Sequence, residues 1–197
     1  LTSANSINIA RLIPQSFYYY EAFKQLNDYN NPVAFVVPSG NYGNITAGLI
    51  AQKMGLPISH FVAASNANDI VPHYLCTGNY NPRPSIRTLS NAMDVGNPSN
   101  FARMQDLSGF TWNNMSENIS GYSINDEATK LGIKEVFEKY NYIISAKIFN
   151  KLNTANKQLF IDSRCASRTH LVDMSVPFNN QNTLPPRKIN SSPFIYY

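Results

Sequence analysis

The 197-residue sequence has few charges, two cysteines and no long apolar run, and each shortage excludes a class of protein. Only 14% of the residues are charged, and the 16 basic side chains, against 12 acidic ones, form no basic stripe, so nucleic-acid binding is not indicated. Cys76 and Cys165 lie far apart without a CxxC pair or clustered histidines. Neither a disulfide framework nor a metal site is therefore expected, and a cytoplasmic location is predicted. Because no run of about eighteen apolar residues occurs, no membrane span is predicted.

The apolar content is sufficient for one folded domain. Hydrophobic residues make up 43% of the chain, which is enough to fill the core of a single α/β domain of this length. The chain starts at Leu1 without Met, which suggests that residue 1 is not the native start.

The most informative stretch runs from Ala34 to Gly55. Phe35–Val37 form a short apolar run typical of a buried parallel strand, which Pro38 ends, and a helix is predicted from Thr46 with Gly55 as its stop. Between them lies a polar turn in which two glycines are expected to permit unusual torsions and to leave main-chain amides open to a ligand. Its residues are Ser39, Gly40, Asn41, Tyr42, Gly43 and Asn44.

This turn has two interpretations. The amides at the start of a helix lack intrahelical partners and, with the helix dipole, bind anions such as phosphate. Ordinary α/β crossovers also use glycine-rich turns. The four polar side chains around the turn favour the anion site: Ser39, Asn41, Asn44 and Thr46.

A second strand is predicted at Ile58–Ala64, which makes a right-handed βαβ unit with the first. The polar run 65–69 follows it, at the end of a parallel sheet where ligands bind, and forms either a cap for a helix at Ile70–Leu75 or a second wall of a cleft. A further helix is expected to start at 123–127, with Ile133, Val136 and Phe137 as its apolar face. Near the start of the chain, Asn5, Ser6 and Asn8 are candidate helix caps before a helical stripe interrupted at Pro14.

Four long segments of the chain are particular enough to compare with a known family: SANSINIARLIPQSFYYYEAF, SGNYGNITAGLIAQKMGLPI, ASNANDIVPHYLCTGNYNPRPSIRTLSNAMDVGNPSNFAR and GYSINDEATKLGIKEVFEKY. They resemble threonine synthase, a pyridoxal-phosphate enzyme of the type II fold. The resemblance covers residues 1–144 and implies part of a large cofactor-binding α/β domain, with a twisted parallel sheet and flanking helices. It also implies that 77–100 is an ordered loop near the cleft.

The resemblance assigns site residues as well. In that family the SGN(F/Y)GN turn holds the cofactor phosphate, here Gly40, Asn41, Tyr42, Gly43 and Asn44. Asn5 and Ser6 are weaker candidates for contact with cofactor and substrate. From Ile144 the chain departs from the family pattern, and residues 145–197 are expected to be a divergent, irregular tail that is non-native or disordered. Within it, Ser163 is the candidate to replace the family's Thr at the pyridine nitrogen of the cofactor.

The resemblance implies conversion of O-phospho-L-homoserine and water to L-threonine and phosphate. That chemistry needs a lysine that forms a Schiff base with the cofactor, and the family carries it in an amino-terminal half that this chain lacks. Five lysines on predicted helices are interpreted as solvated surface residues: Lys24, Lys53, Lys130, Lys134 and Lys139. No catalytic residue is therefore assigned, and the chain is expected to be inactive without its missing half. Two alternatives remain open, a fragment of a related type II lyase or dehydratase, and a catalytically dead phosphate-binding or interaction protein.

Overall fold

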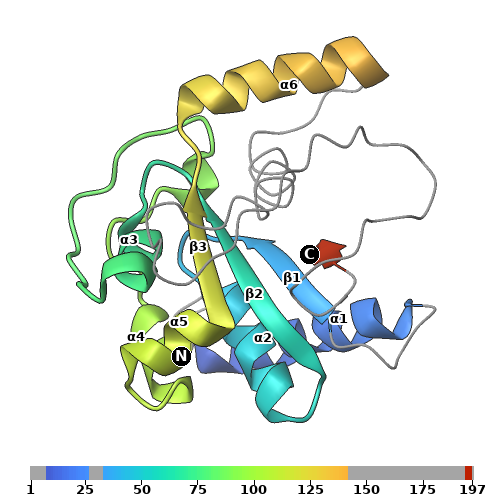
Figure 1. Cartoon of the computed structure of the whole chain (residues 1–197), viewed down its shortest axis with the longest axis vertical. Helices are drawn as coiled ribbons and strands as arrows, with labels where there is room; N and C mark the ends of the chain where they lie inside the picture. The colour runs from blue at the N-terminus through green and yellow to red at the C-terminus, as the bar shows by residue number, and fades with distance from the viewer. Residues whose placement is uncertain (1–7, 27–32, 142–193, 197) are drawn as a thin grey trace.

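The computed structural model describes residues 8–26, 33–141 and 194–196, which are built around a four-stranded parallel sheet (Figure 1). The order of the strands is β3-β2-β1-β4, and every neighbouring pair is parallel. The bounds of the strands are β1 Val33–Pro38, β2 Ile58–Ser65, β3 Ile119–Ser123 and β4 Phe194–Tyr196. The predicted α/β class with a parallel sheet is confirmed.

Helices flank this sheet and connect its strands. Their bounds are η1 Ile9–Arg11, α1 Leu12–Lys24, α2 Gly43–Lys53, α3 Ile70–Thr77, η2 Asn91–Met93, α4 Phe101–Leu107, α5 Trp112–Asn118 and α6 Asp126–Tyr140. Pro14 is the third residue of α1, where its missing N–H costs no intrahelical bond. Figure 1 shows α6 running across one end of the sheet, away from α1 and α2.

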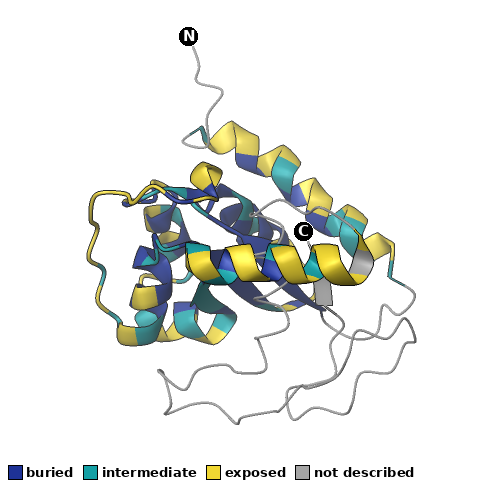
Figure 2. Cartoon of the chain, turned by 90° about the horizontal axis from the view of Figure 1, so that it is seen from above, coloured by how far each residue is buried: buried dark blue, intermediate teal, exposed yellow. Residues whose placement is uncertain are grey.

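The main core lies between the sheet and the helices α1 and α2. The Tyr19 ring of α1 meets the Phe35 ring of β1 edge to face, with centroids 4.8 Å apart, and the Phe61 ring of β2 at 6.0 Å. A Cβ on Gly48 of α2 would lie 2.5 Å from the Phe61 ring and 2.7 Å from the Tyr19 ring. Glycine at this position therefore lets α2 approach the sheet closely, and buried residues line this layer in Figure 2.

The strands and helices of the βαβ unit form where the apolar runs predict them. All six residues of β1 are buried, as expected for a central parallel strand. The α2 helix begins at Gly43, three residues before the predicted start at Thr46, and α3 extends to Thr77. The segment before α6 continues as β3 through Ser123, so α6 begins at Asp126, capped by the Asn125 side chain, which accepts from the Ala128 N–H at 2.9 Å.

Three features differ from the sequence-based expectation. Residues 110–121 carry no sequence pattern that predicts a helix or strand, yet they contain α5 and most of β3. The closing residues 194–196, predicted to belong to an irregular tail, pair in parallel with β1 as β4, while 142–193 lie outside the described residues. Cys76 is disulfide-bonded, contrary to the expectation drawn from the spacing of the two cysteines.

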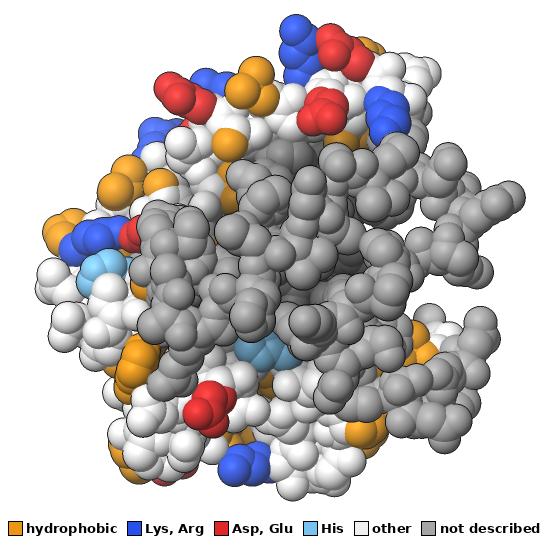
Figure 3. Space-filling view, in the orientation of Figure 1, with side chains coloured by type: hydrophobic (Ala, Val, Ile, Leu, Met, Phe, Trp, Pro, Cys, Tyr) orange, Lys and Arg blue, Asp and Glu red, His pale blue; other side chains and the backbone are white. Residues whose placement is uncertain are grey.

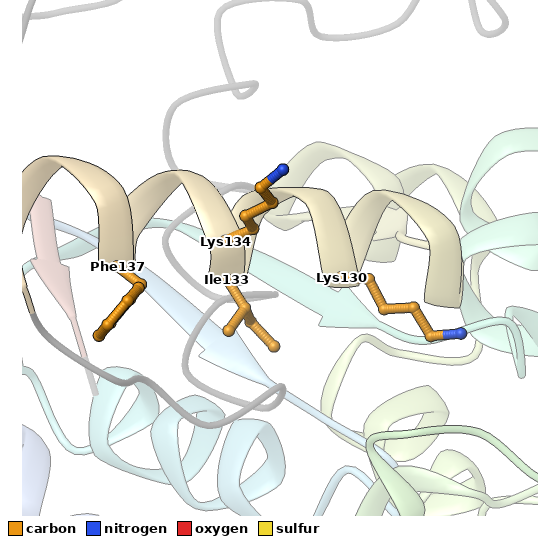
Figure 4. A pocket seen from close by; sticks show the side chains of 4 residues that line it. All are labelled: Lys130, Ile133, Lys134 and Phe137. Atoms are coloured by element: carbon orange, nitrogen blue, oxygen red, sulfur yellow. The ribbon is translucent and has the colours of Figure 1, made fainter.

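The apolar face of α6 is only partly covered. Ile133 and Val136 pack near the buried Ile124, whereas Phe137 is 46% exposed. Together with the stems of Lys130 and Lys134, Ile133 and Phe137 line a shallow groove, in which the Ile133 and Phe137 side chains point to the same side of the helix (Figure 4). In Figure 3, both basic and acidic side chains lie at the α6 end of the molecule.

Candidate functional site

The polar turn joins the carboxyl end of β1 to the first residue of α2. Tyr42, the residue just before α2, has a φ of 60°, in the left-handed region that residues with a side chain rarely adopt. Its ring is buried, and its hydroxyl lies 2.6 Å from the Ser65 Oγ at the end of β2. Burial raises the pKa of the Tyr42 phenol, so this hydroxyl stays protonated. Its bond to Ser65 joins the turn after β1 to the end of β2.

One of the two purposes predicted for the glycines of the turn, the unusual torsions, is not observed. Positive φ angles occur at Tyr42, and neither Gly40 nor Gly43 has one, so the expectation of unusual glycine torsions is wrong. Gly40 is needed for space, because a Cβ there would lie 2.6 Å from the Met93 Cα and 3.0 Å from the Met93 carbonyl oxygen. The 77–100 loop therefore packs directly on the turn.

Several polar side chains of the turn form hydrogen bonds within the turn itself. Asn44 donates from Nδ2 to the Pro38 carbonyl at 2.8 Å, and its Oδ1 accepts from the Ser39 hydroxyl at 3.1 Å and the Ile45 N–H at 2.9 Å. Thr46 donates to the Tyr42 carbonyl at 2.7 Å. These side chains hold the turn in shape, so the interpretation that their number marks direct ligand contacts is not supported.

The main-chain amides remain as the candidate ligand-binding groups of the turn. Within the described part of the chain, the N–H groups of Gly40, Tyr42, Gly43 and Asn44 donate no hydrogen bond. Two of them begin α2, where the helix dipole adds about half a positive charge. Gly40 and Asn44 are partly exposed, so an anion can reach this end of the helix. The arrangement fits a phosphate held by backbone donors without a basic side chain.

A second polar network lies beside the turn at the end of β2. The Asp94 carboxylate accepts hydrogen bonds from Asn66 Nδ2 at 2.7 Å, from Asn68 Nδ2 at 3.2 Å, and from the Thr88 N–H and Oγ1 at 2.9 and 2.7 Å. The Asn66 and Asn68 side chains therefore bind the 77–100 loop. The alternative that the run 65–69 caps α3 is wrong, because no side chain caps that helix. Asp69, at the N-cap position of α3, makes no capping bond and pairs with Arg83.

This network shows that the 77–100 loop is ordered. The Arg83 N–H donates to the Gly96 carbonyl at 3.1 Å, and a Cβ on Gly96 would overlap the Arg83 carbonyl, so the two arms of the loop touch. The Tyr80 ring stacks on the Phe101 ring of α4 at 3.8 Å. The 77–100 loop is thus an ordered segment that packs beside the turn.

The remaining predicted site residues are placed as follows. Asn5, Ser6 and Ser163 lie outside the described residues, while Asn8 accepts from the Ala10 N–H and caps η1. Every lysine in the described ranges is exposed, namely Lys24, Lys53, Lys130, Lys134 and Lys139. Among the residues that the structure describes, no cluster of three His, Cys, Asp or Glu side chains could bind a metal, and no helix is both long and apolar enough to cross a bilayer.

Comparison with known proteins identifies the class of this fold. No family model matches the chain. Maize serine racemase superposes with a TM-score of 0.52 at 18% identity over 79% of this chain, so it shares the fold alone. Threonine synthase from Escherichia coli superposes with a TM-score of 0.72 and 38% identity, over 80% of this chain and 37% of that one. Pyridoxal-phosphate-bound threonine synthase from Brucella melitensis gives the same TM-score at 30% identity, over 80% and 39%. The chain has a partial type II pyridoxal-phosphate enzyme fold.

Sequence relatives narrow the class to one family. Threonine synthase of Buchnera aphidicola subsp. Schizaphis graminum is 35% identical over 98% of this chain and 48% of its own length. That of Haemophilus influenzae is 56% identical over 54% of this chain and 25% of its own length. The chain belongs to the threonine synthase family, whose cofactor is pyridoxal phosphate. It spans from a quarter to about half of the length of these relatives.

Proposed function

We propose that this chain forms the phosphate-binding part of a threonine synthase, which converts O-phospho-L-homoserine and water to L-threonine and phosphate in threonine biosynthesis. The observation that carries the proposal is the set of main-chain donors at Gly40, Tyr42, Gly43 and Asn44, which have no acceptor within the described chain. These donors lie in the SGNYGN turn, which resembles the phosphate-binding turn of the family. When bound, pyridoxal phosphate supplies an electron sink for carbanions formed on an amino-acid substrate.

In this proposal the residues of the chain bind and orient the cofactor phosphate. The amide groups donate to the phosphate oxygens, and the dipole of α2 favours the negative charge. Ser39 and Asn44 act behind the amides, because their side chains bond to each other and to the carbonyl groups of Val37 and Pro38. The main chain therefore need not rearrange when phosphate binds, which lowers the cost of binding.

We further propose that the chain supplies no Schiff-base lysine. A lysine that reacts with a carbonyl must be held in a desolvated site close to it, whereas every lysine in the described ranges is exposed. The other four lysines, Lys147, Lys151, Lys157 and Lys188, lie outside the described residues. The lysine would then come from the part of the threonine synthase chain that this sequence does not match. The chain by itself is expected to form no threonine, and a cytoplasmic location remains a prediction.

The phosphate site is tested with a charge placed among the amides. Asn44 and Asn113 are each the second residue of a helix, α2 and α5. Asn44→Asp adds a negative charge within the turn and removes the Nδ2 donor to the Pro38 carbonyl. It should therefore weaken the binding of inorganic phosphate and pyridoxal phosphate tenfold or more. The matched control, Asn113→Asp, should leave both affinities unchanged. Equal affinities in all three proteins would refute the site.

An activity assay distinguishes the proposed threonine synthase from the two alternative functions. The purified chain is assayed for phosphate release from O-phosphohomoserine, alone and with the unmatched portion of the Escherichia coli enzyme added. Activity only in the mixture would support the proposal, and activity of the chain alone would disprove the absence of a catalytic lysine. Phosphate binding without activity in either case would favour the catalytically dead binding protein, and turnover of another amino acid would favour a related lyase or dehydratase.

A further inference from the structure

The side chain of Asn41 points to the 77–100 loop. Its Oδ1 accepts from the Ser99 N–H at 2.7 Å and from the Ser99 hydroxyl at 3.1 Å, and its Nδ2 lies 2.9 Å from the Ser99 Oγ. Both ends of the Asn41 amide are therefore used in joining the turn to the end of the loop. Asn41 is one of the residues predicted to hold the cofactor phosphate, and its side chain holds the turn against the loop.

The next residue of the loop, Asn100, bonds to the main chain of the turn. Its Nδ2 donates to the Asn41 carbonyl at 3.0 Å, and its side chain is completely buried. Arg103 Nη1 donates to the Asn100 Oδ1 at 2.6 Å. Because a guanidinium only donates, it fixes the Asn100 amide with its oxygen toward Arg103 and its NH₂ group toward Asn41.

This bond sets the direction of one amide in the proposed phosphate site. In a trans peptide the C=O and the following N–H point to opposite sides of a rigid plane, and the described residues contain no cis peptide. The Asn41 carbonyl points to Asn100, so the Tyr42 N–H must point away from it. The Tyr42 N–H is one of the donors without an acceptor in the described chain.

The other side of this peptide plane is also fixed. Tyr42, which follows this peptide plane, has a left-handed backbone conformation, and its hydroxyl is bonded to Ser65. Tyr42 is therefore anchored in the core. The plane is thus held by Asn100 at its carbonyl and by the Tyr42 ring beyond its N–H. Without Asn100, the carbonyl would lose its partner, and rotation of the plane would turn the N–H away.

We propose that Asn100, kept in orientation by Arg103, is a positioning residue that aims the Tyr42 N–H at a bound phosphate. The inference rests on the proposed phosphate site and adds to it a residue 59 positions further along the chain. Asn100 itself does not touch the ligand. Its loss should therefore weaken phosphate binding through one amide and leave the other donors in place.

The test follows individual amides of the full 197-residue chain by ¹⁵N–¹H NMR while inorganic phosphate is added. In the unaltered chain, the Tyr42, Gly43 and Asn44 amides should all shift with one dissociation constant. In Asn100→Ala, that constant should rise about tenfold, and the Tyr42 amide should lose most of its shift while Asn44 keeps its own. The matched control, Asn118→Ala, removes an Asn that donates at 2.8 Å to a backbone carbonyl in α5 and should change neither value.

A merely structural effect of Asn100 would act on all amides equally. Weaker binding with an undiminished Tyr42 shift at saturation would therefore overturn the inference, as would unchanged binding. If Asn100→Ala does not fold, Arg103→Leu releases the Asn100 amide without removing it and should give a smaller but still Tyr42-specific loss. No shift in the unaltered chain would disprove the phosphate site itself, and this inference with it.

Discussion

Replacing Gly40 by alanine should push the turn and the 77–100 loop apart. An alanine Cβ would lie 2.6 Å from the Met93 Cα and 3.0 Å from both the carbonyl carbon and the oxygen of Met93. Ordinary contacts of a Cβ begin near 3.4 Å, so one of the two backbones must move by about 0.8 Å. Neither can move freely, because the turn is bonded to Ser99 and the loop to Asn66.

The expected cost is that of forcing extra volume into a packed site, about 1–3 kcal/mol in the free energy of unfolding. With a slope of about 2 kcal/mol per molar urea, the midpoint of unfolding should fall by roughly 0.5–1.5 M. The binding of inorganic phosphate should weaken as well, because the Gly40 amide lies in the displaced segment. Urea titration followed by Trp112 fluorescence, together with a phosphate titration, measures both effects.

Two further variants distinguish this cause from others. Gly55→Ala at the other end of α2 meets no atom within 4 Å and has a φ of +100°, so it should cost about 1 kcal/mol through backbone strain and leave phosphate affinity intact. Met93→Ala should not rescue Gly40→Ala, because the overlap is with the Met93 backbone. Rescue by Met93→Ala, or a Gly40→Ala chain with unchanged stability, would refute the reasoning.

Three other substitutions have defined outcomes. Tyr42→Phe removes the hydroxyl bonded to Ser65 in the core and should lower the free energy of unfolding by about 1 kcal/mol in urea titration; no change would show that the bond adds nothing. Asp94→Asn replaces a carboxylate that accepts four hydrogen bonds, so trypsin should cut the loop at Arg87 faster than in the unaltered chain, and equal rates would contradict this. Burial lowers the pKa of His60 to about 4. Between about pH 6.5 and pH 4 the unfolded chain therefore binds a proton at His60 that the folded chain does not. The free energy of unfolding should fall by about 2–3 kcal/mol as the pH is lowered through this range. His60→Gln should remove this part of the pH dependence in urea titrations, and an unchanged profile would disprove it.

The sequence by itself determined the central βαβ unit. The apolar run before Pro38, the turn and the helix that ends near Gly55 recur in the structure within a few residues, as does the second strand. These elements are predictable because a buried parallel strand must be continuously apolar and because proline and glycine end regular structure locally. The family motifs also lie within this unit and the loop beside it.

Tertiary packing decided the segments without a local pattern. The strand β3 has the sequence ISGYS, which carries no apolar alternation. It forms because it pairs with β2, beginning at Ile119 opposite Phe61. Gly121 lets this strand lie against α3, since a Cβ there would be 2.5 Å from the Pro72 Cα. Pairing with an existing strand satisfies its backbone, which no property of the segment alone reveals.

The same division applies to the site. The sequence located the turn and its motif, but it suggested that the polar side chains face a ligand and that the glycines supply the unusual torsions. Only the folded chain brings Ser99 and Asn100 against Asn41 and places the left-handed conformation at Tyr42. Contacts between residues nearly sixty positions apart depend on how the whole sheet and its loops pack. The sequence therefore determined where the amides lie along the chain, and the tertiary structure decided which way they point.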